Sequence, residues 1–335
     1  MHLTLSGYGL FLGLKGRRLV VKRRDEKDEF HSLMDLESVL VIGRGVSFSS
    51  DLLSAMVSRG VPVTFANPRG DPYAMLSAAG LHATVKTRRA QLLAYEDERG
   101  VEFARTIVAG KLRNQVALIR YFAKNRDDDE EASKVLAGYA DELSAYIDKA
   151  KGVCGDRVDD VRNELMINEA HAGKIYWRAV RHLLGPESGF TGRRRRPARD
   201  PVNAALNYAY GILYSRIWRA VLLAGLEPYA GFLHSDRPGK PSLVLDLVEE
   251  FRQPLADRPV LTIFTSGGSL NLDERHLLDD KSRDKVVERV NKRFDAKVQF
   301  RGKKLRLESI VQQQVRSLAM YFRGGKPYKP YPFKW

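Results

Sequence analysis

The sequence has little cysteine and no long apolar run. Cys154 is the single cysteine among 335 residues, so no disulfide can form within the chain and no cysteine-based zinc site can be built. No stretch approaches the roughly 18 uninterrupted apolar residues of a membrane span. The N-terminus also lacks the basic segment and apolar run of a signal peptide. These absences predict a cytoplasmic protein with no membrane partner.

Several catalytic motifs are also missing. The chain has no glycine-rich Walker loop, so we expect no ATP hydrolysis. No histidine is followed by aspartate, which excludes a phosphohydrolase built on adjacent His-Asp ligands. Cys154 lies in KGVCGDRVDD with no histidine within ten residues, so it is interpreted as an incidental surface thiol rather than a nucleophile.

Acidic residues are outnumbered by basic ones. The chain has 56 Lys and Arg against 41 Asp and Glu, a formal net charge of +15. Such an excess favours a polyanionic partner, because cations that neutralise phosphates release condensed counterions. The alternative is a protein that is basic without binding nucleic acid, and the size of the excess favours DNA or RNA over it.

The pattern of apolar residues divides the chain. Residues 1–80 hold short β-branched and aromatic runs, namely LTLSGYGLFLGL, GRRLVVKR, SVLVIGR and VPVTFAN, with a short helix near 49–60. A linker is expected at 81–88, and residues 89–335 carry apolar residues at helical spacing, including helices near 158–184 and 201–223. The prediction is an α+β protein, with a small N-terminal β-rich domain and a larger all-α catalytic domain. The C-terminal GGKPYKPYPFKW is interpreted as an irregular, loose end.

One glutamate lies on the apolar face of the helix expected at 158–184. Glu169 follows Leu165 by four residues and precedes Ala172 by three, so it shares their face. A carboxylate directed toward a core must be paired, protonated or bound to a cation. An ion pair with one of the many arginines is the simpler explanation, and metal ligation is the functional one.

A histidine and two carboxylates come later in the chain. His234 ends the apolar run AGFLH, and PSLVLDLVEEFR is expected to form a helix from Pro241 or Ser242. Asp246 and Glu249 are three apart and therefore lie on one helical face. Glu250 is rotated from Glu249 by about 100° and is expected to be solvated.

Glutamate, histidine and a second carboxylate together make a coherent divalent-metal site. Oxygen ligands suit Mg²⁺ or Mn²⁺, and one imidazole moves the preference toward Mn²⁺. Such an ion can polarise a phosphodiester and activate water or a 3′-hydroxyl.

Basic residues surround this set in the sequence. Those on or beside the glutamate helix are Lys174, Arg178, Arg181 and His182, and those in GRRRRPARDP are Arg193, Arg194, Arg195, Arg196 and Arg199. A solvated loop is one interpretation of this run. Contact with DNA phosphates is favoured, because like charges this dense are stabilised by an anion.

Three segments in this order resemble one family. They are NEAHAGKIYW, RRRRPARDPVNAALNYAYGILY and GLEPYAGFLHSDRPGKPSLVLDLVEEFR, and the resemblance extends to TRRAQLLAYEDERGVEFARTIVAGKLRNQ and to VSFSSDLL and GVPVTF. The chain resembles the CRISPR adaptation integrase, the universal CRISPR-associated endonuclease, over essentially its whole length. The resemblance implies a sandwich-like β domain used in dimerisation and a helical catalytic domain.

The resemblance also implies roles for single residues. Glu169, His234 and Glu249 fall on the family's metal-ligand positions, and Asp246 falls on a neighbouring acidic position that takes part in or supports catalysis. The family often has Asp where this chain has Glu249, which leaves the detailed coordination open. Residues matching motif positions near the site are Tyr176, Asn203 and Asn207, and a helix motif with a possible structural role comprises Lys111, Asn114 and Gln115.

The activity implied is attack by the 3′-hydroxyl of a short duplex on the repeat end of a CRISPR array, in antiviral defence. The same site could hydrolyse branched DNA. The implied partners are double-stranded and branched DNA, a second copy of the chain, and a small ferredoxin-like CRISPR adaptation protein that completes a heterohexamer. Two alternatives stay open: a general metal-dependent nuclease that acts on branched DNA in repair, and a DNA-binding protein with no chemistry.

Overall fold

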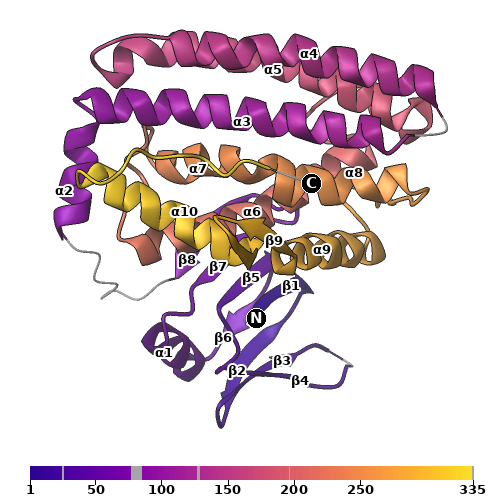
Figure 1. The fold of residues 1–335 in the computed structure, drawn as a ribbon. Helices are drawn as coiled ribbons and strands as arrows, with labels where there is room; N and C mark the ends of the chain where they lie inside the picture. The colour runs from indigo at the N-terminus through magenta and orange to yellow at the C-terminus, as the bar shows by residue number, and fades with distance from the viewer. Residues whose placement is uncertain (25, 77–84, 127–128, 196, 334–335) are drawn as a thin grey trace.

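The computed structural model describes residues 1–24, 26–76, 85–126, 129–195 and 197–333. Within these ranges the N-terminal part is rich in strands and the rest is mainly helical (Figure 1). The α+β class predicted from the sequence is confirmed. No helix in the described ranges is both long and apolar enough to cross a bilayer.

Two four-stranded sheets form the N-terminal part. One has the order β1-β5-β7-β8 and the other β4-β3-β2-β6. The elements are β1 (His2–Tyr8), β2 (Phe11–Lys15), β3 (Arg18–Lys22), β4 (Glu29–Ser32), β5 (Ser38–Arg44), β6 (Ser47–Phe48), α1 (Ser50–Ser58), β7 (Val63–Ala66) and β8 (Pro72–Leu76). In the first sheet β5 pairs in parallel with both β1 and β7.

The central strand β5 explains how this part joins the helical part. Alternate side chains of a strand point to opposite faces of its sheet. Val39 and Val41 pack in the small core shared with β2, β3 and α1. Leu40 and Ile42 belong instead to the large core of the helical part. Because both faces of β5 are covered, its sequence is a continuous apolar run rather than an alternating one.

A close backbone contact also joins the two parts. Gly70 lies in the turn between β7 and β8, and a Cβ atom on Gly211 would lie 1.9 Å from its carbonyl oxygen. The turn therefore sits directly on the helix that carries Gly211, and a side chain at that position would push the two apart.

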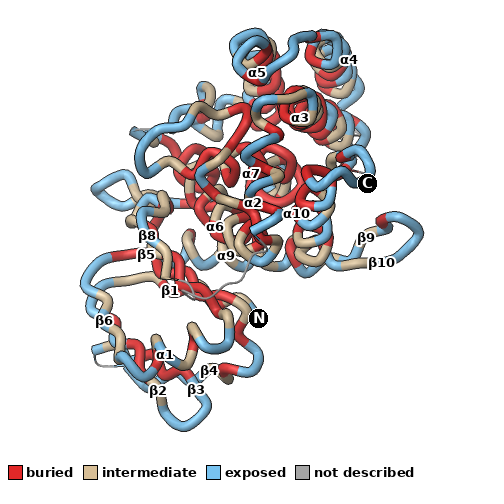
Figure 2. The backbone as a smooth tube through the Cα atoms, turned by 90° about the vertical axis from the view of Figure 1, so that its left-hand side faces the viewer, coloured by how far each residue is buried: buried red, intermediate tan, exposed pale blue. Residues whose placement is uncertain are grey.

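The helical part contains a layer of three long helices over a buried centre. The helices are α2 (Val85–Ala94), α3 (Glu98–Lys124), α4 (Glu130–Gly152), α5 (Val158–Leu184), α6 (Pro201–Ala224), α7 (Ser242–Arg252), α8 (Arg258–Thr265), α9 (Asp280–Asp295) and α10 (Leu307–Phe322), with a 3₁₀ turn at Pro186–Ser188 and a π-helical turn at Gln253–Asp257. α3, α4 and α5 lie side by side (Figure 1). α6 and α7 run through the interior and are mostly buried (Figure 2).

The structure refines two sequence predictions. Residues 85–88 of the expected linker are helical, and residues 81–84 lie outside the described residues. The helical part includes a hairpin, β9 (Lys297–Phe300) with β10 (Lys303–Arg306), that the all-helical prediction missed. Its short strands carry four lysines and arginines, which hid the strand pattern.

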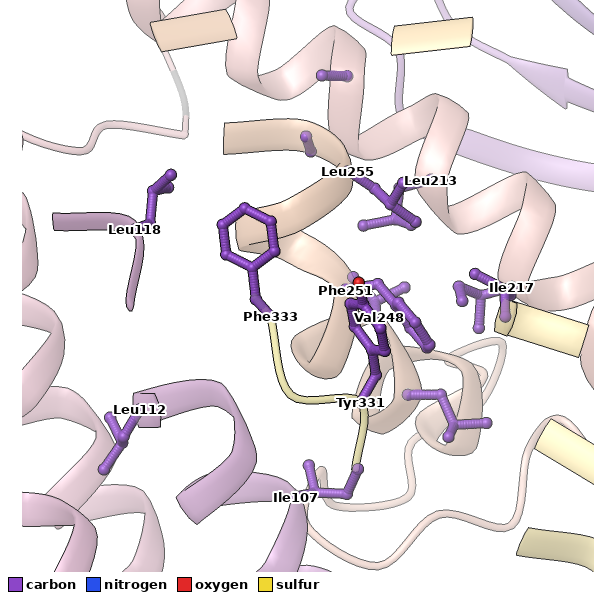
Figure 3. Packing of buried hydrophobic residues seen from close by; sticks show 14 of the residues in the cluster. Ile107, Leu112, Leu118, Leu213, Ile217, Val248, Phe251, Leu255, Tyr331 and Phe333 are labelled. Carbon is purple, nitrogen blue, oxygen red and sulfur yellow. The ribbon is translucent and has the colours of Figure 1, made fainter. Parts of the chain in front are cut away.

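The C-terminal tail was predicted to be a loose end, and that prediction is wrong. Residues 323–333 have little regular structure, but Tyr328, Tyr331 and Phe333 are buried. The rings of Tyr331 and Phe251 stack with their centroids 6.0 Å apart. Figure 3 shows Tyr331 and Phe333 among apolar side chains of α3, α6 and α7. The tail aromatics are thus part of the core, which neighbouring residues in the sequence do not reveal.

Candidate active site

The centre of the site is a lysine placed between two glutamates from different helices. Lys111 of α3 is ion-paired with Glu169 of α5, and its Nζ lies 2.5 Å from Oε2 of Glu249 on α7. The side chains of Lys111 and Glu169 are 11% and 15% exposed, and that of Glu249 is 2% exposed. Two acidic side chains 80 residues apart in the sequence therefore meet at one cationic position.

The charges at this position shift the pKa values of Lys111 and Glu249. Burial alone would lower the pKa of Lys111, but the attraction of Glu169 and Glu249 outweighs it and the pKa is raised. Burial opposes ionisation of Glu249, yet Arg252, Lys111 and His234 lower its pKa to about 2. Arg252 also contributes an ion pair, with Nη2 2.9 Å from Glu249 Oε1. Lys111 and Glu249 are therefore both charged throughout the physiological pH range.

Asp246 holds His234 in place rather than facing the lysine. Its Oδ1 lies 2.7 Å from His234 Nδ1 and accepts the backbone N–H of His234 at 2.9 Å. Its Oδ2 accepts the N–H groups of Phe232 and Leu233 at 2.7 and 3.1 Å. Asp246 is fully buried, and these donors use both of its oxygens. The carboxylate fixes the loop and the ring orientation, leaving His234 Nε2 as the ring nitrogen turned away from Asp246.

The imidazole belongs to the same electrostatic environment as the two glutamates. Burial disfavours the charged form of His234, but the hydrogen bond and charge of Asp246, with the charges of Glu249 and Glu169, raise its pKa. Asp246 and Glu249 lie on one face of α7 but have different partners. Asp246 contacts His234, and Glu249 contacts Lys111.

The four predicted catalytic residues therefore gather in one region, but they do not surround a common point. Among the described residues, no three His, Cys, Asp or Glu side chains are arranged to hold one metal ion. Glu169 and Glu249 do converge on one cation, the ammonium of Lys111. The alternative explanation for Glu169 was an ion pair with arginine. An ion pair is present, but its cation is Lys111 rather than an arginine.

The arginine loop, described at residues 192–195 and 197–199, is held at residues 192–195 by the two predicted asparagines of α6. Asn203 Oδ1 accepts from Arg193 Nη1 and from the Arg194 backbone N–H at 2.9 and 2.8 Å. Asn207 Oδ1 accepts from Arg193 Nη2 at 2.6 Å, and its amide donates to the Arg195 carbonyl at 2.9 Å. Arg193 is thus turned inward, while Arg194 and Arg195 are exposed.

The other predicted DNA-binding residues lie mainly on the surface. Arg178 is engaged by Glu142 at 3.0 Å, and Arg195 lies 3.4 Å from Asp71. Arg196 lies outside the described residues. Lys174, Arg181 and Arg199 are exposed. A pocket of about 160 Å³ beside the loop is lined by three arginines, Arg69, Arg195 and Arg275.

A buried network beside the site includes Tyr176, which the family motif indicated, together with Tyr210 and Asp257, which were not anticipated from the sequence. Tyr176 and Tyr210 both donate to the carboxylate of Asp257, at 2.7 and 2.5 Å. The guanidinium groups of Arg193 and Arg252 lie 5.3 and 4.8 Å from the Tyr210 ring centre. The network therefore links the arginine loop to Arg252, the residue paired with Glu249. Asp257 lies in the π-helical turn after α7, and no helical spacing in the sequence relates it to Tyr176.

Glu250 was predicted to be solvated, and that prediction is wrong. Its side chain is fully buried. Oε1 accepts from Gln314 Nε2 at 2.9 Å and from the Tyr331 N–H at 2.7 Å, and Tyr328 hydroxyl donates to Oε2. Burial raises the pKa of Glu250 to about 7, against the lowering by these donors. The side of α7 that carries Glu250 is covered by the C-terminal tail, whose position the helix sequence does not reveal.

Lys111 itself and Asn114 were noted in the sequence only as parts of a helix motif. The structure gives Asn114 three hydrogen bonds, which join α3 to α7 and to the tail. Its amide donates to the carbonyls of Glu250 and Tyr331 at 2.8 and 3.1 Å, and its Oδ1 accepts from the Phe333 N–H at 2.9 Å. Lys111 precedes Asn114 by about one helical turn, and both residues contact α7. Gln115, the third residue of the motif, is also buried.

Comparison with known proteins identifies the family of the chain. The profile of the family described as CRISPR associated protein Cas1 matches residues 3–292. The CRISPR-associated endonuclease Cas1 1 of Archaeoglobus fulgidus is 36% identical over the full length of both chains. Among solved structures, a casposase bound to integration product has a TM-score of 0.83 at 20% identity, covering 99% of this chain and 94% of that one. A chain of a Cas6-RT-Cas1--Cas2 complex has a TM-score of 0.81 at 22% identity, covering all of this chain and 36% of that one. The identity over the full length, together with the family match, shows that this chain belongs to the Cas1 family of CRISPR-associated endonucleases.

Proposed function

We propose that this chain is a metal-dependent DNA integrase of CRISPR adaptation, which inserts short duplex DNA into a CRISPR array. The observation that carries the proposal is the convergence of Glu169 and Glu249 on one cationic position. Two acidic oxygens that accommodate an ammonium ion at contact distance also have the chemistry to hold Mg²⁺ or Mn²⁺. His234 lies in the same electrostatic environment and supplies a ligand that Mn²⁺ accepts.

In this proposal Glu169, Glu249 and His234 hold the ion, and Asp246 is a positioning residue. A bound Mg²⁺ or Mn²⁺ supplies Lewis-acid stabilisation of negative charge on the reacting phosphate. Asp246 accepts hydrogen bonds from the backbone N–H groups of Leu233 and His234, and it also contacts Nδ1 of the His234 ring. This arrangement presents Nε2 for ligation, in the carboxylate–histidine pattern common at metal sites.

The DNA partner is supported by charge and by the shape of the arginine loop. Arg194 and Arg195 are exposed on a loop whose backbone is fixed by Asn203 and Asn207. A fixed loop loses little conformational freedom when it binds phosphates, so more of the electrostatic attraction remains as affinity. Lys174 and Arg181 add exposed basic side chains on α5, the helix that also carries Glu169.

The proposed assembly is a homodimer joined by a small Cas2-type protein into a heterohexamer. Its support is the likeness in fold to a chain of a complex described as containing Cas1 and Cas2. The strand-transfer reaction is supported in the same way, since the casposase of similar fold is described as bound to an integration product.

An integration assay tests the proposal. Labelled duplex with free 3′-hydroxyls is incubated with a supercoiled plasmid carrying a CRISPR repeat array, together with Mn²⁺ and the Cas2-type partner. Glu169→Gln, His234→Ala and Glu249→Gln should abolish joining and the cleavage of branched DNA while DNA binding is retained, because the basic surface is unchanged. Glu164→Gln is the matched control, since Glu164 is an exposed residue of the same helix.

Three results would contradict the proposal in different ways. Cleavage of branched DNA by the unaltered protein without joining would indicate a general nuclease. Full activity in all three variants would remove these residues from the chemistry. DNA binding with neither cleavage nor joining would indicate a protein with no chemistry of its own.

A further inference from the structure

A buried lysine between two glutamates needs an explanation beyond stability. Burying an ammonium is costly unless opposite charges compensate. Lys111 is only 9% exposed and contacts one carboxylate oxygen from each of two helices. Lys111 therefore places an ammonium between two carboxylates at the meeting point of α3, α5 and α7.

The same two carboxylates are the ones proposed to hold the divalent ion. Both contact the single Nζ atom of Lys111, so the ammonium lies where a shared ion would have to lie. Among the described residues no three-ligand group is assembled around one point. Glu169 and Glu249 instead contact the lysine nitrogen, and His234 Nδ1 contacts Asp246.

We propose that Lys111 is a built-in counter-ion that competes with the divalent metal for Glu169 and Glu249. The inference rests on the proposed function, since it takes these residues as metal ligands. In the absence of metal the ammonium, together with Arg252 on Glu249, balances the charges of Glu169 and Glu249 and keeps the three helices together. Metal binding requires the ammonium to leave, and the flexible four-carbon stem of lysine permits that movement. The competition lowers the affinity for the ion, so Lys111 sets the metal concentration at which the site fills.

The replacement Lys111→Met tests this, because it keeps the length of the side chain and removes the charge. Mn²⁺ binding is measured by isothermal titration on the full chain. The variant should bind Mn²⁺ at least about tenfold more tightly, which is about 1.4 kcal/mol. Without metal it should melt at a lower temperature than the unaltered protein, and saturating Mn²⁺ should raise its melting temperature by more, because the ion replaces the missing charge.

Lys124→Met is the matched control. Lys124 lies on the same helix, is exposed, and is 13 residues or about 20 Å away. Its Mn²⁺ affinity should equal that of the unaltered protein.

A structure of the unaltered protein with Mn²⁺ gives a second test that does not depend on the folding of the variant. Lys111 Nζ should have left both carboxylates, with Mn²⁺ in its place. An Nζ still bridging Glu169 and Glu249 beside bound Mn²⁺, or a Lys111→Met variant with equal or weaker affinity, would overturn the competition but leave the proposed function intact. Absence of Mn²⁺ from these residues in both proteins would overturn both proposals.

Discussion

The buried carboxyl of Glu250 should make the stability of the protein fall as the pH rises toward neutrality. Its pKa is raised from 4.5 to about 7 by burial beneath the C-terminal tail. Above pH 4.5 the unfolded chain loses this proton while the folded protein keeps it, so unfolding is favoured increasingly until the pH passes about 7. One pKa unit is worth about 1.4 kcal/mol, so the loss between pH 4.5 and 7 is about 3 kcal/mol. The contribution of Glu250 to stability is therefore most favourable below this range.

The replacement Glu250→Gln should abolish this contribution. The amide oxygen of glutamine can still accept from Gln314 and from the Tyr331 N–H, and the Tyr328 hydroxyl can accept where it now donates. The hydrogen bonds are therefore kept while the ionisable group is removed. At pH 8 the variant should be more stable than the unaltered protein by up to about 3 kcal/mol, and at pH 4.5 the two should be similar.

The assay is urea-induced unfolding at several pH values between 4.5 and 8.5, followed by circular dichroism. Other groups titrate in the same range, so the informative quantity is the difference in unfolding free energy between variant and unaltered protein at each pH. Glu288→Gln is the control, because Glu288 is exposed on α9 and its difference should stay near zero. A difference for Glu250→Gln that does not change with pH would refute the reasoning, since a buried carboxyl with a raised pKa must produce such a change.

Two further predictions concern the site and the junction between the two parts of the chain. Asp246→Asn should lower the pKa of His234, which NMR titration would measure, because Asp246 raises that pKa. It should also reduce joining by about 10- to 100-fold. An unchanged His234 pKa would contradict the role given to Asp246. Gly211→Ala should lower the free energy of unfolding by about 1–3 kcal/mol, because the new Cβ would lie 1.9 Å from the Gly70 carbonyl oxygen. Gly138→Ala, on the open face of α4, should leave stability equal or slightly higher, and equal effects of the two alanines in thermal melts would argue against the close contact.

Periodic patterns in the sequence were sufficient to predict the elements nearest the site. The helix expected at 158–184 is α5, Val158–Leu184, because its apolar stripe and flanking glycines are local signals. The helix expected from Pro201 begins there, where Asp200 caps it. The same local rules placed Asp246 and Glu249 on one turn of α7, and identified Glu169 as a carboxylate directed inward.

Local sequence patterns could not predict contacts between residues that lie far apart in the chain. Glu169 needed a positive partner, but that this is Lys111 follows from the packing of α3 against α5 and α7. Glu250 was assigned to solvent because a helical wheel shows the direction of a side chain but not what covers it, and the tail that covers it begins more than 70 residues later.

The sequence alone determined the class of fold, the long helices, the basic character and the residue types available for chemistry, because propensity, periodicity and charge act between neighbours along the chain. The tertiary structure decided which charges meet. It set a lysine between two glutamates, gave Asp246 to His234 and buried Glu250 under the tail. The physical reason is that electrostatic interactions and burial depend on distance in space, and chain folding brings together groups that sequence spacing does not relate.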